Sequence, residues 1–359
     1  MTTPRFEGNG LPCLIGSLPL TDYAQAARLV WEHTPEIPLW VQLPRVPGES
    51  MTRQFAAGLP GLAEEGGRAF VDTAGPDFEK NLLGFYEEAL ALQDAAEILD
   101  RSRFAMAPAA AGGFFELIRQ AMERTPPPLA VKGQIIGPVS FGTSLCDRNG
   151  KAIFYDAQLR DAFVQLLALR VRWQVRRLAA LKRPVLLFID DPAITGFGSS
   201  MYIGLNREDI CQSLGVMIDA VHREAGLAGV HICANADWTL VLDSAADILS
   251  FDAYAYFDQF VIYRDAIRRF VERGGLIAWG LVPTLSPEDL QRETTDSLFE
   301  QWKLKSVQVA ALGIDPNRLL AQSLITPACG MGTLSVDLAM KALRLTRELS
   351  NRIRTEHGA

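Results

Sequence analysis

The chain has 359 residues, of which 48% are hydrophobic and 21% are charged, the balance of a folded protein with a large core. Its net charge of -7 argues against an electrostatic nucleic-acid binder, whose surface is basic. No apolar run approaches the roughly 20 residues that cross a bilayer, and the first 20 residues lack the basic start and apolar core of a signal peptide, so we expect a cytoplasmic protein.

Short apolar runs alternate with longer helical patterns along the whole chain. The runs are almost continuously hydrophobic, which is typical of parallel strands that are covered on both faces. We therefore predict strands at residues 12–16, 38–43, 129–136, 184–190, 229–233, 247–252, 275–280 and 318–325.

The segments between these runs have helical features. Residues 151–183 contain neither Gly nor Pro, and residues 338–349 repeat apolar side chains every three or four positions. Asn206 is placed to cap a further helix, with Asp209 at its third position. Helices between eight strands predict an α/β fold, a (β/α)8 TIM barrel.

We predict that residues 1–359 form a single catalytic barrel. The region 44–128 is longer than one crossover between strands needs. We interpret it as a cap-like insertion over the barrel mouth.

Three side chains of types that ligate metals lie at or just after the ends of predicted strands. His231 and Cys233 are two residues apart at a strand end, so their side chains share a face. Cys329 follows the last predicted strand. One imidazole and two thiolates predict a zinc site with an open coordination position, which is the pattern of a catalytic site.

Other polar residues also follow predicted strands, where barrel enzymes place their active sites. Ser17, Asp190 and Asp252 belong to this set. The remaining cysteines, Cys13, Cys146 and Cys211, are interpreted as small buried hydrophobic residues. For the remaining histidines we expect surface roles: His33, His222 and His357.

At these positions the sequence resembles the C-terminal catalytic barrel of cobalamin-independent methionine synthase, in the superfamily that includes uroporphyrinogen decarboxylase. Five segments in the same order carry the resemblance: residues 15–19 (IGSLP), 131–139 (VKGQIIGPV), 189–193 (IDDPA), 231–233 (HIC) and 327–330 (PACG).

The resemblance implies transfer of a methyl group to the thiol of homocysteine, giving methionine. It implies zinc ligation by His231, Cys233 and Cys329, which would be the catalytic group, together with Asp252, where the family has a longer Glu. It also implies that Asp190 binds the substrate amine and that Ser17 holds its carboxylate.

The methyl donor is inferred from two departures from the family. Residues 280–285 (GLVPTL) contain no counterpart of the family's His that serves protonation of the folate leaving group. The family's folate-stacking aromatic is not evident in residues 140–143 (SFGT). We therefore expect methylcobalamin or a methylated corrinoid protein as the donor.

Two alternatives stay open. A corrinoid-dependent methyltransferase for another thiol, such as coenzyme M, would use the same zinc chemistry. A non-catalytic zinc- or thiol-binding barrel would also carry these ligands.

A second acid is expected to bind the substrate amine, and Asp72, Asp77 and Glu79 are the candidates.

Overall fold

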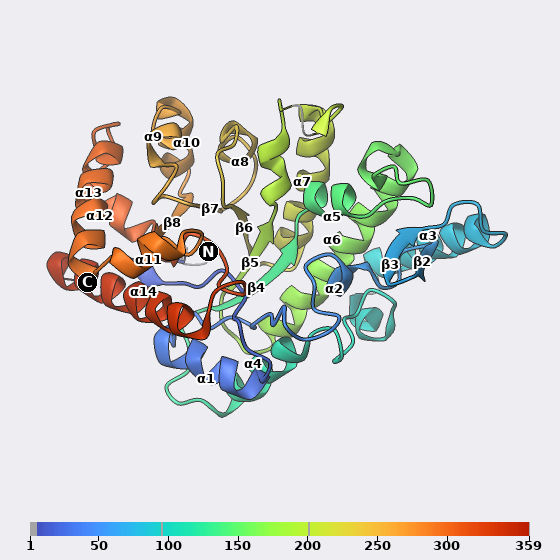
Figure 1. The fold of residues 1–359 in the computed structure, drawn as a ribbon, viewed down its shortest axis with the longest axis horizontal. Coiled ribbons are helices and arrows are strands. Elements are labelled where there is room, and N and C mark those ends of the chain that lie inside the picture. The colour runs from blue at the N-terminus through green and yellow to red at the C-terminus, as the bar shows by residue number, and fades with distance from the viewer. Residues whose placement is uncertain (1–5, 95, 200–201, 359) are drawn as a thin grey trace.

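The computed structural model describes residues 6–94, 96–199 and 202–358 (Figure 1). In these ranges, parallel strands form a seven-stranded sheet with the order β1-β9-β8-β7-β6-β5-β4. The strands are Leu11–Pro12 (β1), Val131–Ile136 (β4), Val185–Asp190 (β5), Leu227–Ile232 (β6), Ile248–Phe251 (β7), Leu276–Val282 (β8) and Ser323–Pro327 (β9).

The sheet curls around its own apolar side chains. Alternate residues of a strand face the same side. Inward-facing residues from opposite ends of the strand order meet in one enclosed cluster, and each large member stabilises the fold by about 1.5–3 kcal/mol. The members are Leu11, Cys13, Ile37, Ala130, Leu186, Phe188, Ile248, Leu276, Ala278 and Leu324.

The expected eighth strand does not form a ladder. Residues 38–43 make one parallel bridge to each side, Leu39 to Lys132 and Ser17 to Gln42. The side chain of Gln134 donates to the carbonyl oxygen of Trp40 at 2.7 Å, where a regular ladder would use a backbone N–H. The predicted closed barrel is therefore observed as a curled seven-stranded sheet whose two edges are joined by single bridges.

Helices cover the outer face of the sheet: α6 packs on β4 and β5, α7 on β6, α12 on β8, and α14 on β1 and β9. Among the described residues, no helix is long and apolar enough to span a membrane. The helices outside the region 44–128 are Tyr23–His33 (α1), Pro138–Ser144 (α5), Ala157–Ala179 (α6), Arg207–Arg223 (α7), Thr239–Leu242 (α8), Phe257–Phe260 (α9), Arg264–Glu272 (α10), Pro287–Arg292 (α11), Thr295–Ala310 (α12), Pro316–Ala321 (α13) and Val336–His357 (α14), with 3-10 helices at Ile153–Tyr155 and Pro192–Gly196.

Local signals explain two helix starts. The side chain of Asn206 accepts a hydrogen bond from the Asp209 N–H at 2.8 Å, which confirms the predicted cap of α7. The prediction of a strand at 318–325 is wrong in its first half, which is α13. The Asp315 side chain accepts from the Arg318 N–H, and Pro316 occupies the first helical position, so the chain is helical until β9 begins.

The region 44–128 contains an antiparallel hairpin and several helices. Its elements are Arg53–Ala56 (α2), Leu62–Glu65 (β2), Arg68–Val71 (β3), Phe78–Asp94 (α3), a 3-10 helix at Ala96–Arg101, and Gly112–Glu123 (α4). Its first residues, from Pro44 to Met51, border the cavity described below. That the region caps a single catalytic domain stays a prediction.

Candidate metal centre

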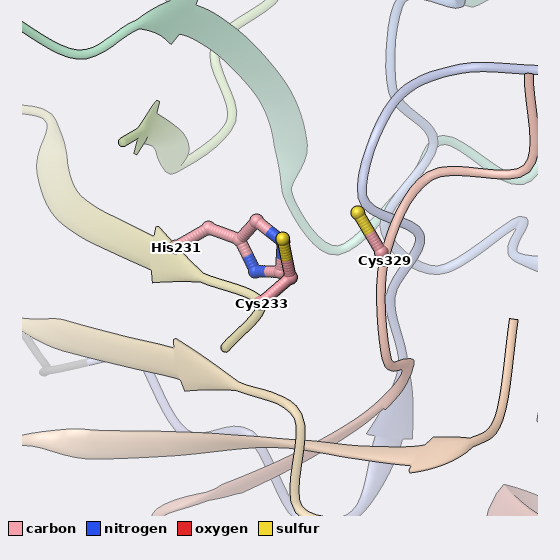
Figure 2. Close-up of side chains that lie close together, drawn as sticks. All are labelled: His231, Cys233 and Cys329. Atoms are coloured by element: carbon pink, nitrogen blue, oxygen red, sulfur yellow. The ribbon is translucent and has the colours of Figure 1, made fainter. Parts of the chain in front are cut away.

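His231, Cys233 and Cys329 converge at the carboxyl ends of the strands. Their ligand atoms all lie within 4.8 Å of one another. Figure 2 shows His231 and Cys233 at one strand end and Cys329 on a separate loop, with its side chain directed toward them. β6 and β9 are separated by β7 and β8 in the sheet, so the curl of the sheet brings the three side chains together.

A neighbouring strand orients the His231 ring. Its Nδ1 lies 2.9 Å from the Ser250 hydroxyl on β7, the residue paired with His231 in the ladder. Its Nε2 is buried and has no hydrogen-bond partner among the described residues. A buried nitrogen without a partner is costly, and a metal ion would satisfy it.

The Cys233 and Cys329 thiols each change the pKa of the other. The hydrogen bond from the Cys329 thiol to the Cys233 sulfur lowers the pKa of Cys233, and His231 lowers it further. The same hydrogen bond, with burial, raises the pKa of Cys329. The pair therefore favours one thiolate and one thiol, and a metal that replaces the shared proton would bind both as thiolates.

Ser17 holds the loop that carries Cys329. Its hydroxyl accepts from the Gly332 N–H at 3.1 Å, and its carbonyl accepts from the Met331 N–H at 2.9 Å. A Cβ at Gly330 would lie 2.3 Å from the Ser17 hydroxyl oxygen, so glycine is required where the loop passes this close to Ser17. Ser17 thus has a structural role.

A cavity of about 460 Å³ opens above the three ligands. It is lined by the predicted site residues Ser17, Asp190, His231, Cys233 and Cys329. Asp190 Oδ1 is buried and has no hydrogen-bond partner in the described part of the chain. Burial raises the pKa of this carboxyl to about 6, against the opposing effects of Lys132 and His231. An ammonium group is the ligand that such an unpaired carboxylate would bind.

Glu49 is a cavity residue that the sequence interpretation missed. It is 1% exposed and lines the cavity. Oε1 accepts from the Tyr23 hydroxyl at 2.5 Å and Oε2 accepts from the Leu43 N–H at 2.7 Å. Burial raises the pKa of this carboxyl. Glu49 precedes α2 in an irregular segment, where no strand or helix period marks it.

The acids that were expected to assist Asp190 lie elsewhere. Asp72 and Asp77 line a different pocket, between the β2–β3 hairpin and α3. Asp72 pairs with Arg148 at 2.7 Å. Glu79 lies in α3 and is not among the residues that line the cavity. Glu49 is thus the second carboxylate of the cavity.

Asp191 and Asp252 have structural partners. Asp191 accepts hydrogen bonds from the backbone N–H groups of Val139 and Ser140 and so caps α5. Asp252 Oδ1 accepts from the Ala255 N–H at 2.9 Å. Asp252 does not belong to the group of ligand atoms within 4.8 Å, and its role as a fourth protein ligand stays a prediction.

The other cysteines and histidines lie outside this group. Cys13 is buried, as expected, but Cys211 is exposed on α7 and Cys146 is half-buried, so the expectation of burial is wrong for Cys211. His33 is 5% exposed, with Nδ1 at 2.9 Å from the Leu29 carbonyl oxygen, and the surface role expected for it is wrong.

The chain was compared with family models, curated proteins and solved structures. No family model matches the chain, and no curated protein matches it. Among solved structures, a B12-independent methionine synthase from Shewanella sp. W3-18-1 in complex with selenomethionine is similar at 16% identity, over 67% of each chain, with a TM-score of 0.46. A likeness at this level establishes neither a family nor an activity for this chain.

Proposed function

We propose that the chain is a zinc-dependent methyltransferase that moves a methyl group to the thiol of homocysteine, giving methionine. The observation that carries the proposal is one cavity that joins a His-Cys-Cys group to two buried carboxylates. The first set suits a metal-bound thiol, and the second suits the ammonium group of an amino acid.

Zinc fits the donor set of His231, Cys233 and Cys329. The orphaned Nε2 of His231 and the two sulfurs would hold it, and three protein ligands leave a position for a substrate. When bound, the ion would supply the charge that keeps a substrate thiol deprotonated at neutral pH. We propose Asp252 as a group that supports this centre from nearby.

The cavity side chains would position the substrate. Asp190 and Glu49 would bind its ammonium group from two sides. The Ser17 hydroxyl would donate to its carboxylate while still accepting from Gly332. Both acids are buried, so a charge-assisted hydrogen bond to either would be shielded from water.

The residues that line the cavity also bear on the choice of methyl donor. Transfer from methyltetrahydrofolate requires protonation of its leaving nitrogen, and general acid help is typically worth about 10²–10⁴-fold. The two carboxylic acids that line the cavity are assigned to the amine, and Leu285 follows β8 at the rim. We therefore propose methylcobalamin or a methylated corrinoid protein, whose cobalt leaves without a proton.

A methyl-transfer assay tests the activity. Purified protein with zinc and homocysteine should form methionine from methylcobalamin or a methylated corrinoid protein, and little or none from methyltetrahydrofolate alone. Brisk turnover with methyltetrahydrofolate and no corrinoid would contradict the proposed donor. No methylation of homocysteine by any donor would contradict the proposed reaction.

Calorimetry with homocysteine tests the two acids separately. Asp190→Asn and Glu49→Gln should each retain zinc but weaken binding by about 1.5–3 kcal/mol, the range for a lost charge-assisted hydrogen bond. Glu123→Gln, at an exposed residue of α4, is the matched control. Unchanged affinity in either cavity variant removes that residue from the substrate site.

The cavity favours an amino-acid thiol over coenzyme M, which has no ammonium group. Two buried carboxylates would face the sulfonate of coenzyme M with like charge. A non-catalytic thiol-binding protein would bind homocysteine equally well but would form no methionine in the assay above.

A further inference from the structure

Cys329 lies on a different kind of backbone segment from the other two proposed ligands, His231 and Cys233. His231 belongs to β6, and Cys233 follows it directly, whereas Cys329 lies two residues beyond the end of β9. A ligand on an irregular segment needs hydrogen-bond partners of its own to keep its direction. For Cys329, such a partner comes from the segment that follows β8.

The β8–β9 ladder ends just before Cys329. Val282 pairs with Pro327 after a register shift between Gly280 and Val282, and the Val282 carbonyl oxygen accepts from the Ala328 N–H at 2.9 Å. The next residue on the β8 side is Pro283, which has no N–H to donate. The backbone thus offers no regular continuation of the ladder to Cys329.

Thr284 replaces that missing continuation with its side chain. Its Oγ1 donates to the Cys329 carbonyl oxygen at 2.9 Å and accepts from the Cys329 N–H, also at 2.9 Å. The side chain is 2% exposed, and its own N–H is bonded to the Val282 carbonyl oxygen at 2.9 Å. One hydroxyl therefore holds both backbone groups of a proposed ligand, from a residue that is itself fixed.

We propose that Thr284 is a positioning residue of the metal centre, which holds the backbone of Cys329 so that its sulfur points to His231 and Cys233. The inference rests on the proposed function only in taking Cys329 as a metal ligand. Thr284 is not among the residues that line the cavity, and its hydroxyl bonds the backbone of Cys329, so it would act on a metal through Cys329.

The direct test compares the zinc affinity of Thr284→Val, which keeps the shape but loses both hydrogen bonds, with that of Thr284→Ser, which keeps the hydroxyl. Loss of a residue that orients a ligand typically costs about 10–100-fold in metal affinity. We expect a loss of that size in Thr284→Val, measured by competition with a chromophoric chelator, and near wild-type affinity in Thr284→Ser. Thr346→Val is the matched control, because the buried hydroxyl of Thr346 donates to the Ala342 carbonyl oxygen within α14.

Two further measurements separate positioning from general stability. The thiolate-to-cobalt charge-transfer band of the cobalt(II) protein should change in Thr284→Val and not in Thr346→Val. In the metal-free protein, the Cys329 amide should exchange faster with solvent in Thr284→Val because its acceptor is gone. If Thr284→Val fails to fold, Thr284→Ala is measured in its place against Thr284→Ser.

The outcomes are distinct. Wild-type affinity and an unchanged cobalt spectrum in Thr284→Val, or in Thr284→Ala where that variant is used, would overturn the role of Thr284 while leaving the metal centre intact. Equal losses in Thr284→Val and Thr346→Val would also overturn it. A wild-type protein that binds neither zinc nor cobalt would overturn the proposed function together with this inference.

Discussion

The strand ends and the loops contribute to the cavity in different ways. Asp190 and His231 lie on adjacent parallel strands, paired in the ladder, and their directions follow from strand alternation. Cys329 and Glu49 lie on irregular segments and are held by side-chain hydroxyls, Thr284 and Tyr23. The half of the cavity at the strand ends (Asp190, His231 and Cys233) is therefore fixed by the sheet. The half on the loops (Cys329 and Glu49) depends on a few individual hydrogen bonds.

The largest expected effect removes a ligand from either half. Cys233→Ser and Cys329→Ser should each reduce bound zinc from about one ion per chain to a trace, because two protein ligands do not hold zinc tightly. Elemental analysis after dialysis measures this, with Cys211→Ser, at an exposed residue of α7, as the control. Full zinc occupancy in both ligand variants would show that the metal site is wrongly assigned.

A second prediction concerns the strand-end half and pH. Burial raises the pKa of Asp190 to about 6, above the ordinary value near 3.9 of an unfolded chain, so the ionised form destabilises the fold. This cost is fully present above about pH 6 and is lost as the pH falls through 6 toward 4. Metal-free Asp190→Asn should therefore be more stable than the wild type by about 3 kcal/mol at neutral pH, and this difference should shrink in acid.

Urea unfolding of both metal-free proteins, between about pH 7.5 and pH 4.5, measures this difference. Asp252, whose pKa burial also raises to about 6, is present in both proteins and cancels in the comparison. Asp191 contributes to the difference, because the charge of Asp190 helps to raise its pKa and is lost in Asp190→Asn. A difference in unfolding free energy that does not vary with pH would show that Asp190 is not titrating in this range.

A third prediction tests whether the strand-end half also needs an individual hydrogen bond. Ser250→Ala removes the partner of His231 Nδ1, and such losses typically cost about 10–100-fold in metal affinity. Ser350→Ala, whose buried hydroxyl donates to the Gly10 carbonyl oxygen, is the control for zinc titrations. If Ser250→Ala binds zinc as the wild type does, the sheet alone orients the His231 ring and the contrast between the two halves becomes sharper.

The smallest expected effect is in the loop half. Tyr23→Phe removes the donor to Glu49 Oε1 but leaves the Leu43 N–H on Oε2. We expect homocysteine binding to weaken by about 0.5–1.5 kcal/mol, the net value of one hydrogen bond. Tyr86→Phe, whose hydroxyl bonds Asp161 in another part of the molecule, is the calorimetric control. A loss equal to that of Glu49→Gln would mean that Tyr23 does more than orient the carboxylate.

The sequence predicted the strand-end half well because period and position are visible in it. The apolar runs located β4 to β8, and residues that follow such runs are the ones that reach the cavity. The loop half was less accessible. Cys329 was recognised through its PACG context, and Glu49 was missed because nothing local marks a carboxylate that becomes buried only when α1 and residues 43–49 pack together.

The predicted strands are wrong where side chains make the hydrogen bonds that a strand ladder would take from the backbone, or where they cap a helix. Residues 38–43 have the composition of a strand, yet the Gln134 amide occupies the Trp40 carbonyl oxygen and the segment forms single bridges. In the same way, Asp315 and Pro316 start α13 where apolar composition alone predicted a strand. Such exchanges depend on partners far along the chain or on capping geometry, which hydrophobic patterns do not carry.

The separation of β6 from β9 in the strand order has a mechanical consequence. The two strands are not neighbours in the sheet, so no strand ladder joins them. An ion held by Cys233 and Cys329 would therefore crosslink their ends and stabilise the curvature of the sheet. Its binding energy would add to folding stability, by about 4 kcal/mol when free zinc exceeds its dissociation constant 1,000-fold. The thermal midpoint of this protein would then rise with the concentration of free zinc.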